Sequence, residues 1–220
     1  MSGELLLAAI AAYFCGAIPF GVLVGTARGV DVRAVGSGNS GATNVWRTLG
    51  PVAGTLVFLL DAGKGWLAVW FARELLYDFH QPQSTWQIAM CAALVVLGHT
   101  FSVFLKFRGG KGIATAFGAM LAIVPLVALG CIALWAIVLL MSRTISVASI
   151  VACIATPIGL VWTRAPLPYG TVVILLAMVA IWKHIPNMKR IISGTEPKIG
   201  RKKTVIEPEI SPAIKGAAER

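Results

Sequence analysis

The sequence predicts an all-α, polytopic membrane protein with seven transmembrane helices. Hydrophobic residues make up 57% of the 220 residues, charged residues make up only 13%, and the mean hydropathy is +0.82. In an ordinary soluble domain, about a quarter of the residues are charged. A helix needs about 20 apolar residues to cross the hydrocarbon core, so the chain has room for several spans but little for a separate soluble domain.

Seven apolar runs predict the spans. The first run precedes Arg28, the first basic residue, and therefore lacks the charged leader of a cleavable signal peptide, so we expect it to remain as a span. The predicted spans lie near Leu5–Thr26, Val52–Phe71, Trp86–Leu105, Ile113–Pro125, Leu126–Leu140, Ile145–Trp162 and Tyr169–Trp182.

The apolar stretch from Gly112 to Leu140 fits either one helix or two. As one helix its 29 residues would be about 44 Å long, which exceeds a hydrocarbon core of about 30 Å. Pro125 near its middle favours a break, but the two halves are short for helices that face lipid. Length alone therefore leaves both divisions open.

The distribution of basic residues decides between them. With seven spans and the N-terminus outside, sixteen Lys and Arg residues lie inside and only Arg73 and Arg164 lie outside, with Lys64 within a span. This asymmetry follows the positive-inside rule, so we predict an outer N-terminus and an inner C-terminus. The net charge of +10 is then explained by topology and by contact with anionic headgroups, rather than by nucleic-acid binding.

The chain is expected to form one domain with a tail. We assign residues 1–195 to a single integral membrane domain and residues 196–220, which mix Lys, Arg, Pro and Gly, to a flexible basic tail. The cysteines are scattered singly through apolar runs, which predicts neither a disulfide nor a metal site. They are Cys15, Cys91, Cys131 and Cys153.

The predicted inner loop Arg28–Gly50 contains the string GSGNSGATN, residues 36–44. Small residues let the backbone approach a ligand and turn its N–H groups inward, as in phosphate cradles. A flexible loop between helices is the alternative. Arg47 favours phosphate, because a guanidinium binds phosphate oxygens in a bidentate fork.

The second inner loop, Lys106–Gly112, is a basic glycine-rich turn that opens a helix. Free N–H groups, the helix dipole and cations would meet there. It is not a P-loop, because Leu105 replaces the first glycine and Gly112 replaces Ser/Thr. A basic loop that only sets topology is the alternative.

The third inner segment starts at the end of the last span. If that helix continues, His184, Asn187 and Arg190 share one face, although Pro186 can disturb the turn. A histidine can accept a proton at neutral pH. The alternative, for this histidine and for His99, is a residue that merely marks the membrane boundary.

Polar residues also occur within the predicted spans. Asp61 and Lys64 can pair at i, i+3 spacing, either as functional groups or as a structural ion pair that braces the first loop. Ser146 and Ser149 share a face near the inner end of the sixth span. They are weaker ligand candidates, since hydroxyls often bond neighbouring helices.

Three strings together resemble the bacterial membrane acyltransferases that use acyl phosphate to acylate glycerol 3-phosphate. The strings are GSGNSGATN with Arg47, GHTFSVFLKFRGGKGIAT (98–115) and HIPNMKRIISGTE (184–196), and the resemblance covers essentially the whole chain. Ser102 stands where the family usually has proline, which affects local helix geometry but removes no chemical group.

The resemblance implies residue roles. The implied catalytic residues are His184, Asn187, Ser37 and Lys111. The implied substrate- and phosphate-binding residues are Gly36, Ser37, Gly38, Asn39, Gly41, Thr43, Asn44, Arg47, Gly109, Gly110, Lys111, Gly112, Ser149 and Arg190, with support from Asp61, Lys64, His99 and Glu196. The proton acceptor is either His184 or a phosphate oxygen of the substrate.

The implied reaction moves a fatty acyl group to the 1-hydroxyl of glycerol 3-phosphate, giving lysophosphatidic acid and phosphate at the cytoplasmic face of a bacterial inner membrane. This is the first step of phospholipid synthesis, and it requires no metal, organic cofactor, nucleic acid or obligatory protein partner. No HxxxxD pairing occurs at His80, His99 or His184, which favours acyl phosphate over thioester donors. The competing hypotheses are a transporter of a phosphorylated solute and a membrane scaffold.

Overall fold

The computed structural model describes residues 3–77 and 83–200. His80 therefore lies outside the described residues. The regular structure of the described part is helical. Its elements are α1 Gly3–Ala17, α2 Phe20–Ala27, α3 Ala42–Leu49, α4 Pro51–Leu76, α5 Gln83–Thr100, the 3₁₀ helix η1 Val103–Leu105, α6 Ile113–Ile123, α7 Pro125–Ser142, α8 Ile145–Trp162, α9 Leu167–Lys183 and α10 Ile185–Ile192.

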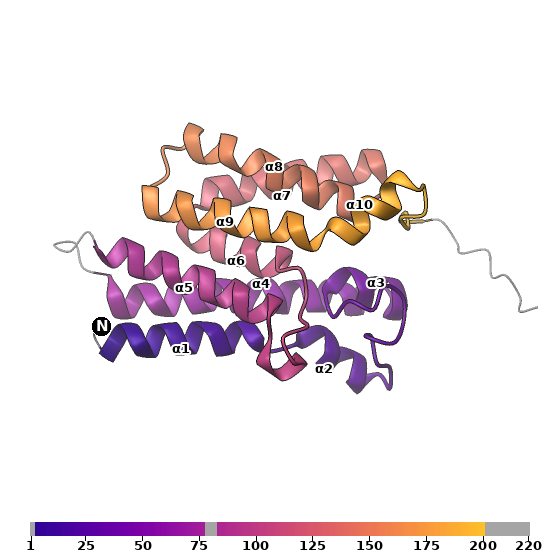
Figure 1. Cartoon of the computed structure of the whole chain (residues 1–220), viewed down its shortest axis with the longest axis horizontal. Coiled ribbons are helices and arrows are strands. Elements are labelled where there is room, and N and C mark those ends of the chain that lie inside the picture. The colour runs from indigo at the N-terminus through magenta and orange to yellow at the C-terminus, as the bar shows by residue number, and fades with distance from the viewer. Residues whose placement is uncertain (1–2, 78–82, 201–220) are drawn as a thin grey trace, which may run out of the picture.

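The long helices lie side by side as a bundle (Figure 1). One group contains α1, α4 and α5, the other contains α7, α8 and α9, and α6 lies between them. The N-terminus lies at one end of the bundle. The loop before α3, the loop between α5 and α6, and α10 all lie toward the other end (Figure 1).

The helices confirm a multi-pass, all-α membrane protein. Five segments are long and apolar enough to cross a membrane, namely Gly3–Ala27, Pro51–Leu76, Ser84–Leu105, Pro125–Ser142 and Ile145–Trp162. The pair α9 and α10, bent by 50°, counts as a sixth, and α6 is a shorter apolar helix. Seven spans and the side of each terminus therefore stay predictions.

The first predicted span is two helices rather than one. It breaks before Pro19, which has no N–H to donate. The buried Lys64 of α4 donates to the carbonyl oxygen of Ile18 at this break over 2.8 Å, and its Nζ lies 2.6 Å from Oδ1 of the buried Asp61. The Asp61–Lys64 pair therefore holds α4 against the break between α1 and α2, rather than bracing the loop Arg28–Gly50 directly.

The division of the stretch from Gly112 to Leu140 is confirmed. α6 ends at Ile123, and α7 begins at Pro125, in the first turn, where the missing N–H costs no helical hydrogen bond.

Two glycines hold α6 close to α4. A Cβ atom at Gly65 would lie 2.2 Å from the carbonyl oxygen of Thr115, and one at Gly118 would lie 1.8 Å from that of Ala62. Small residues allow the two backbones to touch, as is common between membrane helices. This contact fixes the start of α6, and thus the end of the Lys106–Gly112 loop, against α4.

The expectation of a loop throughout Arg28–Gly50 was wrong for residues 42–49, which form α3. This helix has only eight residues and one buried hydrophobic side chain, Val45, while Trp46 is exposed. Its apolar pattern was too short to be recognised beside the glycine-rich string. The helix carries Asn44 and Arg47 on a rigid element next to α4 (Figure 1).

Candidate active site

The structure brings all three sequence motifs to one cavity. Its polar part, here called the head, lies toward the end of the bundle that carries α3 and α10. The described residues that line the head include Ser37, Asn39, Gly41, Thr43, Asn44, Arg47, Lys111, Gly112, Ser146, His184, Asn187 and Glu196.

The same cavity continues between α6, α7, α8 and α9 as an apolar limb. Ser149 lines the junction between head and limb. Beyond it, the lining side chains are mainly apolar, and they include Phe117, Met120, Ile132, Trp135, Val173, Leu176 and Ala177. One cavity therefore joins a polar end to a long hydrophobic end.

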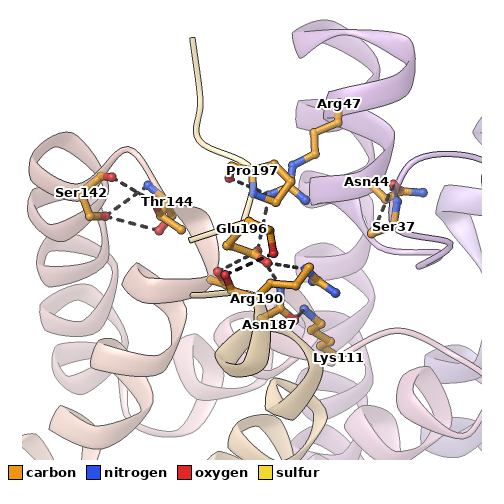
Figure 2. A network of polar contacts seen from close by, with 12 residues as sticks. Ser37, Asn44, Arg47, Lys111, Ser142, Thr144, Asn187, Arg190, Glu196 and Pro197 are labelled. Atoms are coloured by element: carbon orange, nitrogen blue, oxygen red, sulfur yellow. Dashed lines mark hydrogen bonds and ion pairs between the residues drawn. The ribbon is translucent and has the colours of Figure 1, made fainter. Parts of the chain in front are cut away.

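Glu196 is the centre of the polar network in the head (Figure 2). Its carboxylate accepts hydrogen bonds from Ser146 Oγ at 2.9 Å, Asn187 Nδ2 at 2.7 Å and Arg190 Nε at 2.7 Å. Arg47 Nη2 lies 3.8 Å from the same carboxylate. Glu196 thus connects α3, α8 and α10. The sequence had suggested only a supporting role for this residue.

Lys111 joins this network through Asn187, to whose Oδ1 its ammonium donates (Figure 2). Burial lowers the pKa of Lys111 to about 8; Glu196 opposes that shift, and Arg190 and Arg47 add to it. Burial would raise the pKa of Glu196, but its hydrogen bonds outweigh burial and hold that pKa below its usual value. Glu196 is therefore ionised, while Lys111 loses its charge at mildly alkaline pH.

His184 lies at the bend between α9 and α10, with Pro186 in the first turn of α10. The last span therefore does not continue as a straight helix. The imidazole is buried, and its Nδ1 lies 2.7 Å from the carbonyl oxygen of Ala180. Because a carbonyl oxygen only accepts, Nδ1 carries the proton and a neutral His184 has Nε2 as an acceptor.

Asn44 positions the first loop. Its Nδ2 donates to the carbonyl oxygens of Val32 at 2.6 Å and Val35 at 3.1 Å, and its Oδ1 accepts from N and Oγ of Ser37 at 2.8 and 3.2 Å. These four bonds use the whole capacity of the amide. Asn44 therefore holds Ser37 in place at the head, and we assign it no ligand contact. Gly36 approaches the same amide at φ +64°, where a Cβ would lie 2.3 Å from its Oδ1.

The second loop differs from the phosphate cradle that was expected. The N–H of Gly109 donates to the backbone carbonyl oxygen of Thr100 over 3.1 Å, and the N–H of Gly110 donates to the backbone carbonyl oxygen of His99 over 3.2 Å. Neither N–H is therefore free to bind an anion. A Cβ at Gly110 would lie 2.2 Å from Nε2 of His99, which explains the glycine. Lys111 and Gly112 line the cavity, whereas Gly36, Gly38, Gly109, Gly110, Lys64 and Arg190 are not among its described lining residues.

Asp61 and His99 form part of the cavity wall. His99 Nδ1 lies 3.4 Å from Asp61 Oδ1, so the wall is continuous with the ion pair of Asp61 and Lys64. Nearby, Ser102 has φ −63°, the value that proline would fix, and its hydroxyl donates to the carbonyl oxygen of Ala17 over 2.6 Å. The serine thus keeps the local geometry expected of proline.

Sequence reasoning missed the residues of the apolar limb, such as Met120, Trp135 and Val173. They lie in uniformly apolar runs, where no period separates side chains that line a cavity from those that face lipid. One available signal was the indole N–H of Trp135, a polar group within such a run. Among the described residues, no group of three or more His, Cys, Asp or Glu side chains could hold a metal ion, and the four cysteines are free.

Fold and site together define a polytopic membrane protein whose cavity joins a head rich in cationic side chains to a hydrophobic limb. A family model described as glycerol-3-phosphate acyltransferase matches residues 6–194. The glycerol-3-phosphate acyltransferase of Bordetella pertussis strain Tohama I is 42% identical over 202 residues, which cover 88% of this chain and 91% of the relative. That of Laribacter hongkongensis strain HLHK9 is 43% identical over 195 residues, which cover 88% and 96%.

Two solved structures are also similar. Both are of PlsY (YgiH), described as an integral membrane glycerol 3-phosphate acyltransferase, in its glycerol 3-phosphate form and its lysophosphatidic acid form. Their TM-scores are 0.83 and 0.81, with 38% and 37% identity, and each match covers 90% of this chain and 96% of the other. The chain belongs to the glycerol-3-phosphate acyltransferase family, which confirms the resemblance drawn from the three strings.

Proposed function

We propose that this protein transfers a fatty acyl group from acyl phosphate to the 1-hydroxyl of glycerol 3-phosphate, giving lysophosphatidic acid and phosphate. The observation that supports this reaction is the continuity of the cavity, which joins the head around Arg47 and Lys111 to the apolar limb between α6 and α9. Both substrates carry phosphate, and the donor also carries a fatty chain. Such a cavity accommodates both kinds of group.

In this mechanism, Arg47 and Lys111 bind phosphate oxygens and hold the two anionic substrates close together. Ser37 donates its hydroxyl proton to Asn44, so at the head its oxygen can accept a hydrogen bond from a hydroxyl of glycerol 3-phosphate. The hydroxyl oxygen of glycerol 3-phosphate attacks the acyl carbon, and a tetrahedral intermediate forms. Its collapse breaks the bond between the acyl carbon and the phosphate oxygen, and phosphate leaves with the electron pair.

Two groups can take the proton of the attacking hydroxyl. One is Nε2 of His184, and the other is a phosphate oxygen of the donor. Asn187 connects Lys111 to Glu196 and keeps the cation next to the histidine. His184→Gln separates the two routes, because glutamine keeps a polar group but does not act as a base. Activity within tenfold of the parent protein favours the phosphate oxygen as the proton acceptor. A larger loss of activity favours the histidine.

We also propose the location of the reaction. Seven spans, with the N-terminus outside and α10 inside, place the head at the cytoplasmic face of the bacterial inner membrane, as the distribution of basic residues predicts. Residues 1–195 then form one membrane domain. Glu196, which the sequence placed at the start of the predicted tail, belongs to the head. Residues 201–220 of that predicted tail lie outside the described residues. Metal, cofactor, nucleic acid and a protein partner have no part in the proposal.

The test supplies palmitoyl phosphate and glycerol 3-phosphate to the purified protein in lipid. The expected products are 1-acylglycerol 3-phosphate and inorganic phosphate. Lys111→Ala and His184→Ala are expected to lower the rate at least 100-fold, because each removes a group from the head. Lys106→Ala is the matched control, since this lysine of the same loop is exposed and is not among the lining residues.

The outcomes separate the functions. Near-normal rates in Lys111→Ala and His184→Ala would refute the proposed site. Accumulation of glycerol 3-phosphate inside proteoliposomes, without a new ester, would instead identify a transporter. The variants must also retain the melting temperature of the parent protein, so that a lost rate is not a lost fold.

A further inference from the structure

A hydrogen bond crosses the apolar limb close to the head. Trp135 of α7 donates from Nε1 to Oγ of Ser149 on α8 over 3.1 Å. Both side chains line the cavity; Ser149 is buried and Trp135 is half-buried. An indole N–H in an apolar helix needs an acceptor, and here its acceptor is a residue of the candidate site.

The position of Ser149 matches the junction of a two-part ligand. Ser146, one turn earlier on α8, binds Glu196 in the head. Three residues along a helix correspond to about 4.5 Å. On the other side, the next α8 residues that line the cavity are Ala152 and Cys153. A ligand with its phosphate in the head and its chain in the limb therefore brings its carbonyl group close to Ser149.

The donor and acceptor roles at this pair are fixed by chemistry. The indole Nε1 only donates, so its bond occupies a lone pair of the Ser149 oxygen and leaves the hydroxyl proton to be donated elsewhere. Within the part of the chain that the structure describes, no acceptor for that proton is seen. A hydroxyl that accepts one hydrogen bond becomes a better donor in the next.

We propose that Trp135 is a positioning residue that orients the Ser149 hydroxyl toward the carbonyl oxygen of the acyl donor. When the hydroxyl oxygen of the acceptor bonds to the acyl carbon, the carbonyl electron pair moves onto this oxygen. Ser149 then donates to the resulting oxyanion without losing its own proton, and the bond to phosphate breaks as the pair returns. This inference rests on the proposed acyl transfer.

The test compares Trp135→Phe, which removes the N–H but keeps an aromatic ring, with Ser149→Ala and with the double variant. Removal of one oxyanion donor costs about 100-fold in kcat, and loss of its orientation should cost about tenfold. The KM for glycerol 3-phosphate should stay within twofold, because the head is unchanged. Trp162→Phe, at a tryptophan that is 81% exposed and does not line the cavity, is the matched control.

The double variant distinguishes positioning from a structural role. If Trp135 acts through Ser149, Trp135→Phe adds no loss in the Ser149→Ala background. Independent, multiplicative losses would overturn the inference, as would a normal kcat in Trp135→Phe. Should Trp135→Phe fail to fold, benzothienylalanine at position 135 keeps the shape of the ring without the N–H, and the same two results apply. A parent protein that forms no ester at all would refute the proposed function instead.

Discussion

At the scale of single residues, one carboxylate in the head faces three cations. Glu196 contacts Arg190 directly, lies near Arg47 and is linked to Lys111 through Asn187. Buried charges are stable only with partners, and here the positive charges outnumber the negative one. The excess positive charge is what a phosphate dianion can neutralise, while Glu196 keeps the cations in place without it.

The lowered pKa of Lys111 gives the enzyme an alkaline limit. A free lysine keeps its charge to about pH 10, whereas Lys111, with a pKa of about 8, loses it two pH units earlier. At pH 9 the value of kcat/KM for glycerol 3-phosphate should therefore be about tenfold below its value at pH 7. The decrease should be smaller at saturating substrate, because bound phosphate favours the charged amine.

The control for this pH profile is Lys111→Arg, whose guanidinium stays charged throughout. Whatever its absolute rate, its profile should be flat between pH 7 and 9. Unfolding at high pH would not explain this loss of kcat/KM. Between pH 8 and 10.5 the unfolded lysine, with a pKa of 10.5, binds more protons than the folded one. The free energy of unfolding that this group contributes therefore increases as the pH rises. A parent profile that is flat to pH 10 would contradict the assignment of Lys111.

At the scale of helices, we expect the length of the apolar limb to limit the length of the acyl chain that the protein accepts. The α9 residue that lines the cavity farthest from His184 is Val173, eleven residues before it, or about 16 Å along the helix. Val173→Phe fills this end. Each methylene that is then excluded costs about 0.8 kcal/mol of burial, so long acyl phosphates should lose about fourfold per excluded methylene against short ones.

The measurement is a competition between acyl phosphates of graded length, with the products separated by mass. Leu175→Phe is the matched control, because Leu175 lies on the same helix and is 51% exposed on its other side. It should leave the chain-length preference unchanged. An unaltered preference in Val173→Phe would show that the chain does not reach this end of the limb.

The helices also show what a single sequence can predict. Long apolar runs and Pro125 were enough for the membrane helices and for the break between α6 and α7, because length and a missing N–H act locally. The eight-residue α3 was not predicted, because its apolar pattern is too short to stand out in a single sequence. The bend at His184 was allowed for only as a disturbance that Pro186 could cause.

At the scale of the whole molecule, the gathering of the three motifs was predictable, whereas their hydrogen bonds were not. Alternating spans necessarily return to the same side, which brought the three loops together. Glu196 contacts Arg47 and Ser146, which are distant in sequence, and its role depended on those contacts. The amides of Gly109 and Gly110, expected to face a ligand, are instead used by α5.

The proposed topology predicts which positions are accessible from each side. In a background without the four native cysteines, single cysteines at the exposed positions Lys106 and Lys189 should react with an impermeant maleimide only from the cytoplasmic side. A cysteine at the exposed Arg164 should react from the opposite side. Labelling of intact cells and of inverted vesicles gives the two measurements.

Arg73 provides a second position that the topology predicts to lie outside, at the far end of α4 from the head. If cysteines at positions 73 and 164 are labelled from the same side, the result does not depend on one loop alone. Labelling of Lys106 and Lys189 from opposite sides would be incompatible with a single head and would overturn the mechanism.

The late position of Glu196 in the chain has a consequence for biosynthesis. Ribosomes make the chain from its N-terminus, so Arg47 on α3 and Ser146 on α8 are made before the residue that links them to Asn187. Until then the basic side chains repel one another with no carboxylate among them. A chain truncated before residue 196 should therefore be inserted into the membrane yet be inactive, because it lacks the carboxylate that joins α3, α8 and α10.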